Sequence, residues 1–244
     1  MRTARSLASL RAGRTDWYRI ENKAGGAELY IYDEIGYFGV TAQVLVAELK
    51  NVTGDLTVHI NSPGGDVFDG IAILNALRNH KGEVTTIVDG LAASAASFIA
   101  QAGSKRVMAR NSELMIHDAS GLCIGNSEDM SEMLALLERT SDNIADVYAE
   151  RSGKGDRAAW RAAMSAETWY SAQEAVDAGL ADEVDGVATK QDEDKLAASW
   201  DLSIFAHRNR TEAPAPVVLD VVPETPNATE WDMGSFLKGL LNGA

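Results

Sequence analysis

The feature that most constrains the fold is a strand pattern that ends in two glycines and leads directly into a helix pattern. Residues 56–60 alternate between apolar and polar side chains, which is typical of a β-strand. Gly64 and Gly65 interrupt this run, and residues 67–77 then have the apolar spacing of an α-helix. Strand–turn–helix units of this kind build α/β folds, in which successive strands pair in parallel.

The same order recurs further along the chain. Residues 84–88 form another β-type run, and residues 94–102 have helical spacing that ends at Gly103. Two shorter strands are expected at residues 107–108 and 114–116. Because strands and helices alternate, the sequence predicts an α/β fold whose parallel strands are joined by right-handed crossovers.

A long helix is expected at residues 127–151. Asn126 or Ser127 supplies its N-cap, and Glu128 and Asp129 suit the positive end of the helix dipole. Its apolar side chains recur at intervals near seven residues, and at 1.5 Å per residue it spans ~37 Å. This length leaves two possibilities open, because the helix either packs on its own domain or projects toward another subunit.

Composition divides the chain into four segments. Residues 1–25 are interpreted as a polar, arginine-rich leader, with a transit peptide as the alternative, and residues 26–186 as the folded domain. Residues 187–229 hold four of the five prolines, which indicates a proline-rich linker or disordered tail. Residues 230–244 have the spacing of a short amphipathic helix, which is marginal on its own.

Charge and residue content argue against several function classes. A formal net charge of -14 repels phosphate, so we expect no nucleic-acid partner. No run approaches the ~20 apolar residues of a membrane span. A single cysteine rules out an internal disulfide and fits the cytoplasm. We expect no cofactor, since neither a phosphate-binding loop nor metal-ligand spacing is visible.

A serine and a histidine follow two of the strand patterns. Ser94 begins the helix after residues 84–88, and His117 ends the strand at residues 114–116. A serine hydroxyl is a weak nucleophile near neutral pH and needs a base. We therefore interpret Ser94 as a nucleophile and His117 as its general base; the alternatives are that Ser94 only caps a helix, or that Ser97 reacts instead. The weaker candidates for the base are His59, His80 and His207.

Four segments, in this order, resemble the Clp-type proteolytic subunit, a self-compartmentalising serine peptidase. They are residues 60–65 (INSPGG), 90–94 (GLAAS), 115–117 (MIH) and 171–180 (SAQEAVDAGL). The similarity extends over residues 29–184. It implies a crotonase-like spiral of repeated β-β-α units, with residues 127–151 as a projecting handle helix. It also implies assembly into rings, typically two stacked heptamers.

The resemblance also implies the remaining site residues. Glu167 occupies the position of the family's triad aspartate, which holds the imidazole in one tautomer, although glutamate is one methylene longer. Asp118 is a weaker candidate for this role. The backbone N–H groups of Gly65 and Ala95 are the implied oxyanion donors, and loss of one such donor typically costs ~2.7–4 kcal/mol of transition-state stabilisation.

We therefore expect a serine endopeptidase that cleaves polypeptides inside a homo-oligomeric ring. Residues 66–70 and 167–169 resemble the phage and prophage head-maturation branch, so the expected partners are a Clp ATPase or phage capsid and scaffold proteins. Three alternatives remain open: a crotonase-type acyl-CoA enzyme, a Ser–Lys peptidase that uses Lys105, and a non-catalytic assembly protein. A reactive lysine would need burial to lower its pKa.

Overall fold

The computed structural model describes residues 18–23, 26–36, 41–185 and 200–221. The first part of the expected leader and the expected helix at residues 230–244 lie outside these ranges. Within the described ranges, no helix combines the length and the apolar character needed to cross a bilayer.

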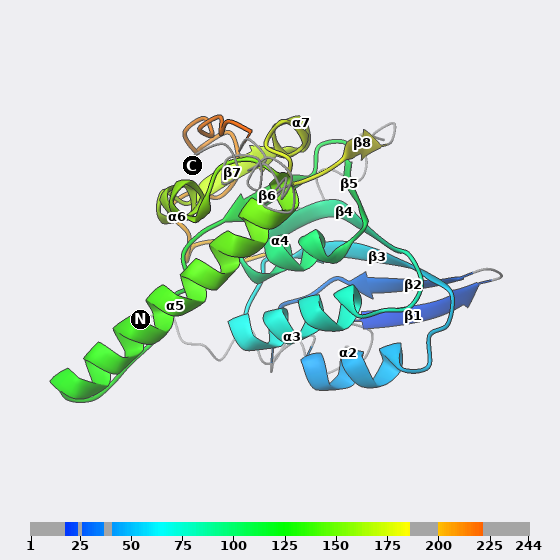
Figure 1. The fold of residues 1–244 in the computed structure, drawn as a ribbon, viewed down its shortest axis with the longest axis horizontal. Helices are drawn as coiled ribbons and strands as arrows, with labels where there is room; N and C mark the ends of the chain where they lie inside the picture. The colour runs from blue at the N-terminus through cyan, green and yellow to red at the C-terminus, as the bar shows by residue number, and fades with distance from the viewer. Residues whose placement is uncertain (1–17, 24–25, 37–40, 186–199, 222–244) are drawn as a thin grey trace, which may run out of the picture.

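A mixed sheet of eight strands forms the centre of the described chain (Figure 1). The strands are β1 (Tyr18–Lys23), β2 (Gly26–Ile31), β3 (Asp55–Ser62), β4 (Val84–Ala93), β5 (Lys105–Ala109), β6 (Glu113–Ile116), β7 (Thr168–Ser171) and β8 (Glu183–Asp185). Strands β2, β3, β4, β5 and β8 pair in parallel in this order, and the parallel pairing agrees with the predicted alternation of strands and helices. Strand β6 pairs in parallel with the second half of β4 and antiparallel with β7, so the sheet divides there.

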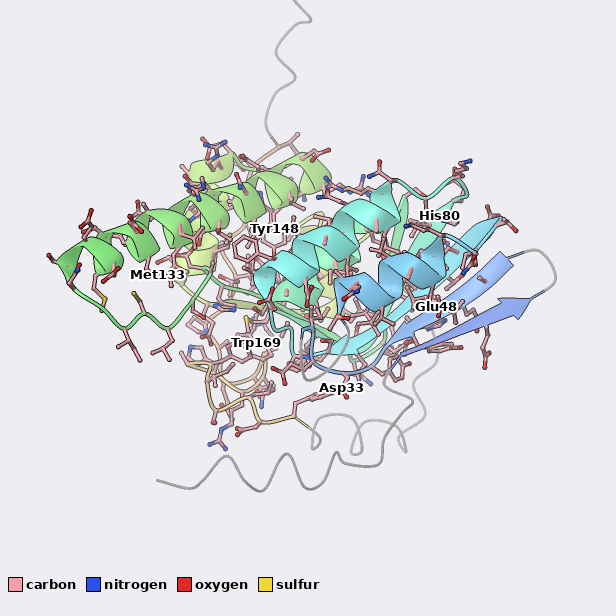
Figure 2. The ribbon with its side chains drawn as sticks, turned by 90° about the horizontal axis from the view of Figure 1, so that it is seen from below. Asp33, Glu48, His80, Met133, Tyr148 and Trp169 are labelled. Carbon is pink, nitrogen blue, oxygen red and sulfur yellow. The ribbon has the colours of Figure 1, made fainter. Side chains whose placement is uncertain are left out.

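Helices cover one face of the sheet and enclose the main core (Figures 1 and 2). They are α2 (Ala42–Leu49), α3 (Val67–Arg78), α4 (Ala95–Ile99), the 3-10 turn η1 (Ala100–Ala102), α5 (Ser127–Ser152), α6 (Arg157–Ser165) and α7 (Ala172–Asp177). Helix α3 begins at Asp66, whose carboxylate accepts the N–H groups of Phe68 and Asp69. The mixed α/β architecture agrees with the predicted fold class.

Helix α5 projects from the body of the protein, as expected for the handle (Figure 1). A capping box between Asn126 and Asp129 starts it, and Gly153 ends it in the left-handed conformation. Its first half is largely exposed, with Leu134 59% accessible, whereas Tyr148 near its end is buried in the main core. The second half of α5 therefore anchors the helix in the main core, while its first half extends into solvent.

Two segments differ from the division expected from composition. Strand β1 lies within the expected leader and pairs with β2, so the sheet begins before residue 26. Residues 200–213, expected to be part of a linker, fold against β6 and β7 and are called the C-terminal strap below. The strap precedes Pro214, but the described residues 214–221, which include Pro214 and Pro216, also contact the domain: Leu219 packs on the main core and Val221 bridges Lys154. The composition of the whole range 187–229 did not reveal the short apolar group that the strap contributes to the second core cluster.

Candidate active site

Ser94 and His117 meet where β4 and β6 end. In the parallel pairing of these strands, Ala93 lies opposite Met115, and the Ser94 N–H donates to the Met115 carbonyl at 2.9 Å. Two residues beyond Met115, His117 places Nε2 2.7 Å from the Ser94 hydroxyl oxygen. The hydroxyl is thus within proton-transfer distance of the imidazole, and the register of the two strands sets that distance.

The backbone of Ser94 shows that its hydroxyl is not used to cap a helix. Ser94 is the N-cap of α4, but its side chain makes no capping hydrogen bond. Its φ of 53° lies in the left-handed region, which costs about 1–3 kcal/mol for a residue other than glycine. A strained strand-to-helix turn is how other serine hydrolases expose a nucleophile. Ser97, the competing hydroxyl, is fully buried and bonded to the Ser94 carbonyl and the Tyr148 hydroxyl.

The surroundings of His117 favour the neutral imidazole. Burial of the ring lowers the pKa of His117 below its ordinary value of 6.5. The negative charges of Glu167 and Asp118 act in the opposite direction but do not outweigh burial. At neutral pH the imidazole is therefore available to accept a proton from Ser94.

The two acids near His117 are each held by other groups. The Glu167 carboxylate accepts the backbone N–H groups of Ala206 and His207, at 2.8 and 2.9 Å. The Trp169 indole N–H also donates to this carboxylate, at 3.4 Å. Glu167 is therefore bonded to the strap and to Trp169, and not to His117. Asp118 pairs instead with the Arg161 guanidinium at 3.1 Å. Both carboxylates thus act on His117 through their charge, and Asp118 is in addition paired with Arg161 of α6.

The glycine turn before α3 packs directly against Ser94. A Cβ on Gly64 would lie 2.6 Å from the Ser94 Cβ, and one on Gly65 would lie 2.0 Å from the Ile35 carbonyl oxygen. Ile35 hydrogen-bonds to the Gly64 carbonyl and the Asp66 N–H, so the intervening Gly65 N–H faces away from Ile35. Gly65 and Ala95 both line the cavity beside Ser94. The sequence analysis singled out Gly65 but did not indicate how closely Gly64 approaches Ser94.

A cavity of about 230 Å³ opens beside Ser94 and His117. The turn before α3, the start of α3 and residues 117–121 form part of its wall, and the apolar part from α4 and α5 consists of Phe98, Met133, Leu136, Leu137, Ile144 and Tyr148. Figure 2 shows Met133 on the projecting part of α5 and Tyr148 on its packed part. The cavity suits an apolar side chain of a bound substrate.

The groups proposed for other chemistries lie away from this cavity. The ammonium of Lys105, on β5, pairs with Glu183 at 2.8 Å, and this hydrogen bond raises the pKa of Lys105. A raised pKa keeps the ammonium charged, the opposite of what a lysine base requires. His59 pairs with Asp89. Among the described residues, no cluster of three or more histidine, cysteine or acidic side chains is arranged to hold a metal.

Comparison with known proteins identifies the family. Residues 30–187 match the family model described as Clp protease. The ATP-dependent Clp protease proteolytic subunit of Leuconostoc citreum (strain KM20) is 36% identical over 160 residues, which cover 63% of this chain and 77% of the relative. The protein of the same name from Streptococcus pneumoniae (strain Hungary19A-6) is 36% identical over 149 residues, 59% and 76% of the two chains. The chain therefore belongs to the Clp protease family and is a serine peptidase.

Proposed function

We propose that the protein is an endopeptidase in which Ser94 attacks the peptide carbonyl and His117 accepts the Ser94 proton. The observation that carries this proposal is the 2.7 Å distance between the Ser94 hydroxyl oxygen and His117 Nε2. The imidazolium then donates the proton to the leaving amine, and an acyl-enzyme remains. Water attacks this ester with His117 again as the base, which releases the acid and restores the serine.

Three further groups would support this chemistry. Gly65 and Ala95 line the same cavity, which supports their backbone N–H groups as the proposed donors to the oxyanion. Glu167 acts on the imidazole through its negative charge, which favours the imidazolium formed during attack. In this proposal Glu167 is the third member of the triad, and it acts on His117 through its charge while its two oxygens accept the N–H groups of Ala206 and His207.

The substrate class follows from the cavity beside the nucleophile. Its wall of Phe98, Leu137 and Ile144 favours an apolar side chain at the residue whose carbonyl is attacked. A crotonase-type acyl-CoA enzyme would use backbone oxyanion donors in a similar way. It would give no role to the hydrogen bond between Ser94 and His117, so polypeptide hydrolysis is the better explanation.

Hydrolysis of a fluorogenic peptide with leucine before the scissile bond tests this proposal. Ser94→Ala and His117→Ala are each expected to lower kcat by several orders of magnitude, as triad substitutions do in other serine proteases. Lys105→Ala is the matched control and should keep wild-type kcat, because its ammonium pairs with Glu183. Hydrolysis that survives Ser94→Ala but depends on Lys105 would contradict the proposal.

We also propose that α5 mediates assembly into a homo-oligomeric ring. The apolar side chains of Leu122, Ile124 and Leu134 are 84%, 88% and 59% exposed in the single chain. A cluster of this kind on a projecting helix and its loop is typical of a protein–protein contact. Leu134→Glu should reduce the mass measured by analytical ultracentrifugation, whereas Ala135→Glu, the same charge on the neighbouring exposed residue, is the control. Equal masses for the two variants would argue against a contact at Leu134.

The proposal also covers the location of the protein and its partner. We place the peptidase in the cytoplasm of a bacterium or of a phage-infected host, and its domain extends beyond residues 26–186 to include β1 and the C-terminal strap. Its partner is either a Clp ATPase or a phage capsid or scaffold protein. Degradation of a folded substrate only with a host Clp ATPase and ATP would support the first partner. Cleavage of assembled proheads without ATP would support the second.

A further inference from the structure

The C-terminal strap packs directly on the proposed general base. The Phe205 ring meets the His117 imidazole edge to face, with ring centroids 5.4 Å apart. It also meets Trp169 at 6.3 Å, and Figure 2 shows Trp169 beside the strap. Phe205 is only 9% exposed, whereas its neighbour Ile204 is 81% exposed. The strap therefore packs Phe205 onto His117 and exposes the preceding residue, Ile204, to solvent.

The strap backbone also fixes the acid beside the base. Successive N–H groups of Ala206 and His207 bond the two different carboxylate oxygens of Glu167. Bonds to both oxygens fix the rotation of the carboxylate as well as its position. Glu167 itself has a φ of 50°, a strained value that persists only where surrounding contacts enforce it.

An ion pair anchors the strap away from the site. The Arg210 guanidinium donates to both carboxylate oxygens of Glu174 at 2.6 Å. The backbone N–H of Arg210 donates to the Glu113 carboxylate at 3.1 Å. The Arg210 hydrogen bond is the main reason that the pKa of Glu174 falls to about 2. Bidentate pairs of this geometry are among the stronger surface ion pairs. Trp200 and Leu202 add apolar contacts, so the strap is held at several points.

We propose that the strap is a positioning element for the catalytic base: Phe205 shields the His117 imidazole from water while the strap backbone holds Glu167 beside it. This inference rests on the proposed function of His117. It assigns a role in the reaction to a segment outside residues 30–187, the part of the chain that matches the family.

The proposal has a consequence for the pH dependence of catalysis. The charged or titratable groups around His117 come from four elements. They are Glu167 just before β7, Asp118 with its partner Arg161 from α6, His207 on the strap, and Asp66 at the start of α3, which lines the same cavity. Removing the Phe205 ring admits water to the imidazole and weakens the burial that opposes its protonation. The carboxylates remain, so the imidazole becomes easier to protonate.

The test is the pH profile of kcat/KM on the leucine peptide, which reports the essential base of the free enzyme. Phe205→Ala should move the acidic limb upward by about half a pH unit or more, within the spread that protein environments give to histidines. Ile204→Ala, which removes an adjacent apolar side chain that faces solvent, should reproduce the wild-type limb. Arg210→Ala releases the anchor without touching His117 and should move the limb in the same direction.

The possible results separate the two proposals. A limb that is unchanged in both Phe205→Ala and Arg210→Ala, or that moves to lower pH, would overturn the strap proposal even if both variants lose thermal stability. Should Phe205→Ala fail to fold, the limb of Arg210→Ala decides. Wild-type hydrolysis that does not depend on Ser94 would overturn the proposed function and, with it, the role of the strap.

Discussion

Substitution of Gly64 by alanine tests how closely the glycine turn must approach the nucleophile. The added Cβ would lie 2.6 Å from the Ala93 carbonyl oxygen and from the Ser94 Cβ, and 2.8 Å from the Ala95 nitrogen. Ordinary contact begins at 3.4 Å, so the turn and the Ser94 segment must separate by about 0.8 Å. This separation moves the two proposed oxyanion donors apart.

The expected loss follows from the energetics of a misplaced donor. Removing one oxyanion donor typically lowers kcat by about 10²–10³-fold, and a displacement near 1 Å has an effect of similar size. We therefore expect Gly64→Ala to reduce kcat on the leucine peptide by about 10²-fold or more, with a much smaller change in KM.

Gly153→Ala is the matched control. Gly153 also has a positive φ, of 63°, but its added Cβ would meet nothing within 4 Å. Both variants place alanine in an unfavourable backbone conformation, which costs about 1–2 kcal/mol of stability, but only Gly64→Ala disturbs the site. The assay compares kcat with thermal unfolding for both variants. Equal kcat values at equal folded fractions would refute the reasoning.

The remaining predictions concern the base and the ion pairs. The acidic limb of wild-type kcat/KM should lie below 6.5, because burial lowers the pKa of His117. Arg161→Ala should lower the stability by about 1 kcal/mol and reduce kcat several-fold, measured by urea unfolding and peptide hydrolysis, since it frees Asp118 next to the base. Above its unfolded pKa of 4.5, ionised Glu174 stabilises the strap through Arg210, and this contribution is lost as the pH falls toward about 2. The difference in melting temperature between wild type and Arg210→Ala should therefore narrow over that range.

The strand patterns, together with the resemblance to the Clp family, were sufficient to predict that Ser94 and His117 lie close together. Ser94 and His117 each follow a strand pattern, and parallel neighbours bring the ends of their strands to the same edge of a sheet. Local strand patterns therefore indicated a contact between two residues that lie 23 positions apart in the sequence. The alternation of strands and helices predicted the parallel pairing seen among β2, β3, β4 and β5, but it did not predict their order.

The contacts around Glu167 could not be predicted from strand and helix patterns. The contacts of Glu167 with Ala206 and His207 join residues about forty positions apart, and no periodic pattern links them. Proline content over a long window indicated disorder, although Trp200, Leu202 and Phe205 form a short apolar group before the first of those prolines. A narrower window would have separated the strap from the proline-rich segment that follows it.

The most direct test of the central claim is to map covalent labelling by a fluorophosphonate probe, using mass spectrometry of the digested protein. The probe reacts with an activated serine hydroxyl, and the 2.7 Å contact between Ser94 and His117 predicts that this hydroxyl is Ser94. We expect one adduct, on Ser94, that is absent in Ser94→Ala and forms far more slowly in His117→Ala. An adduct on another residue, or a labelling rate unchanged by His117→Ala, would contradict the account.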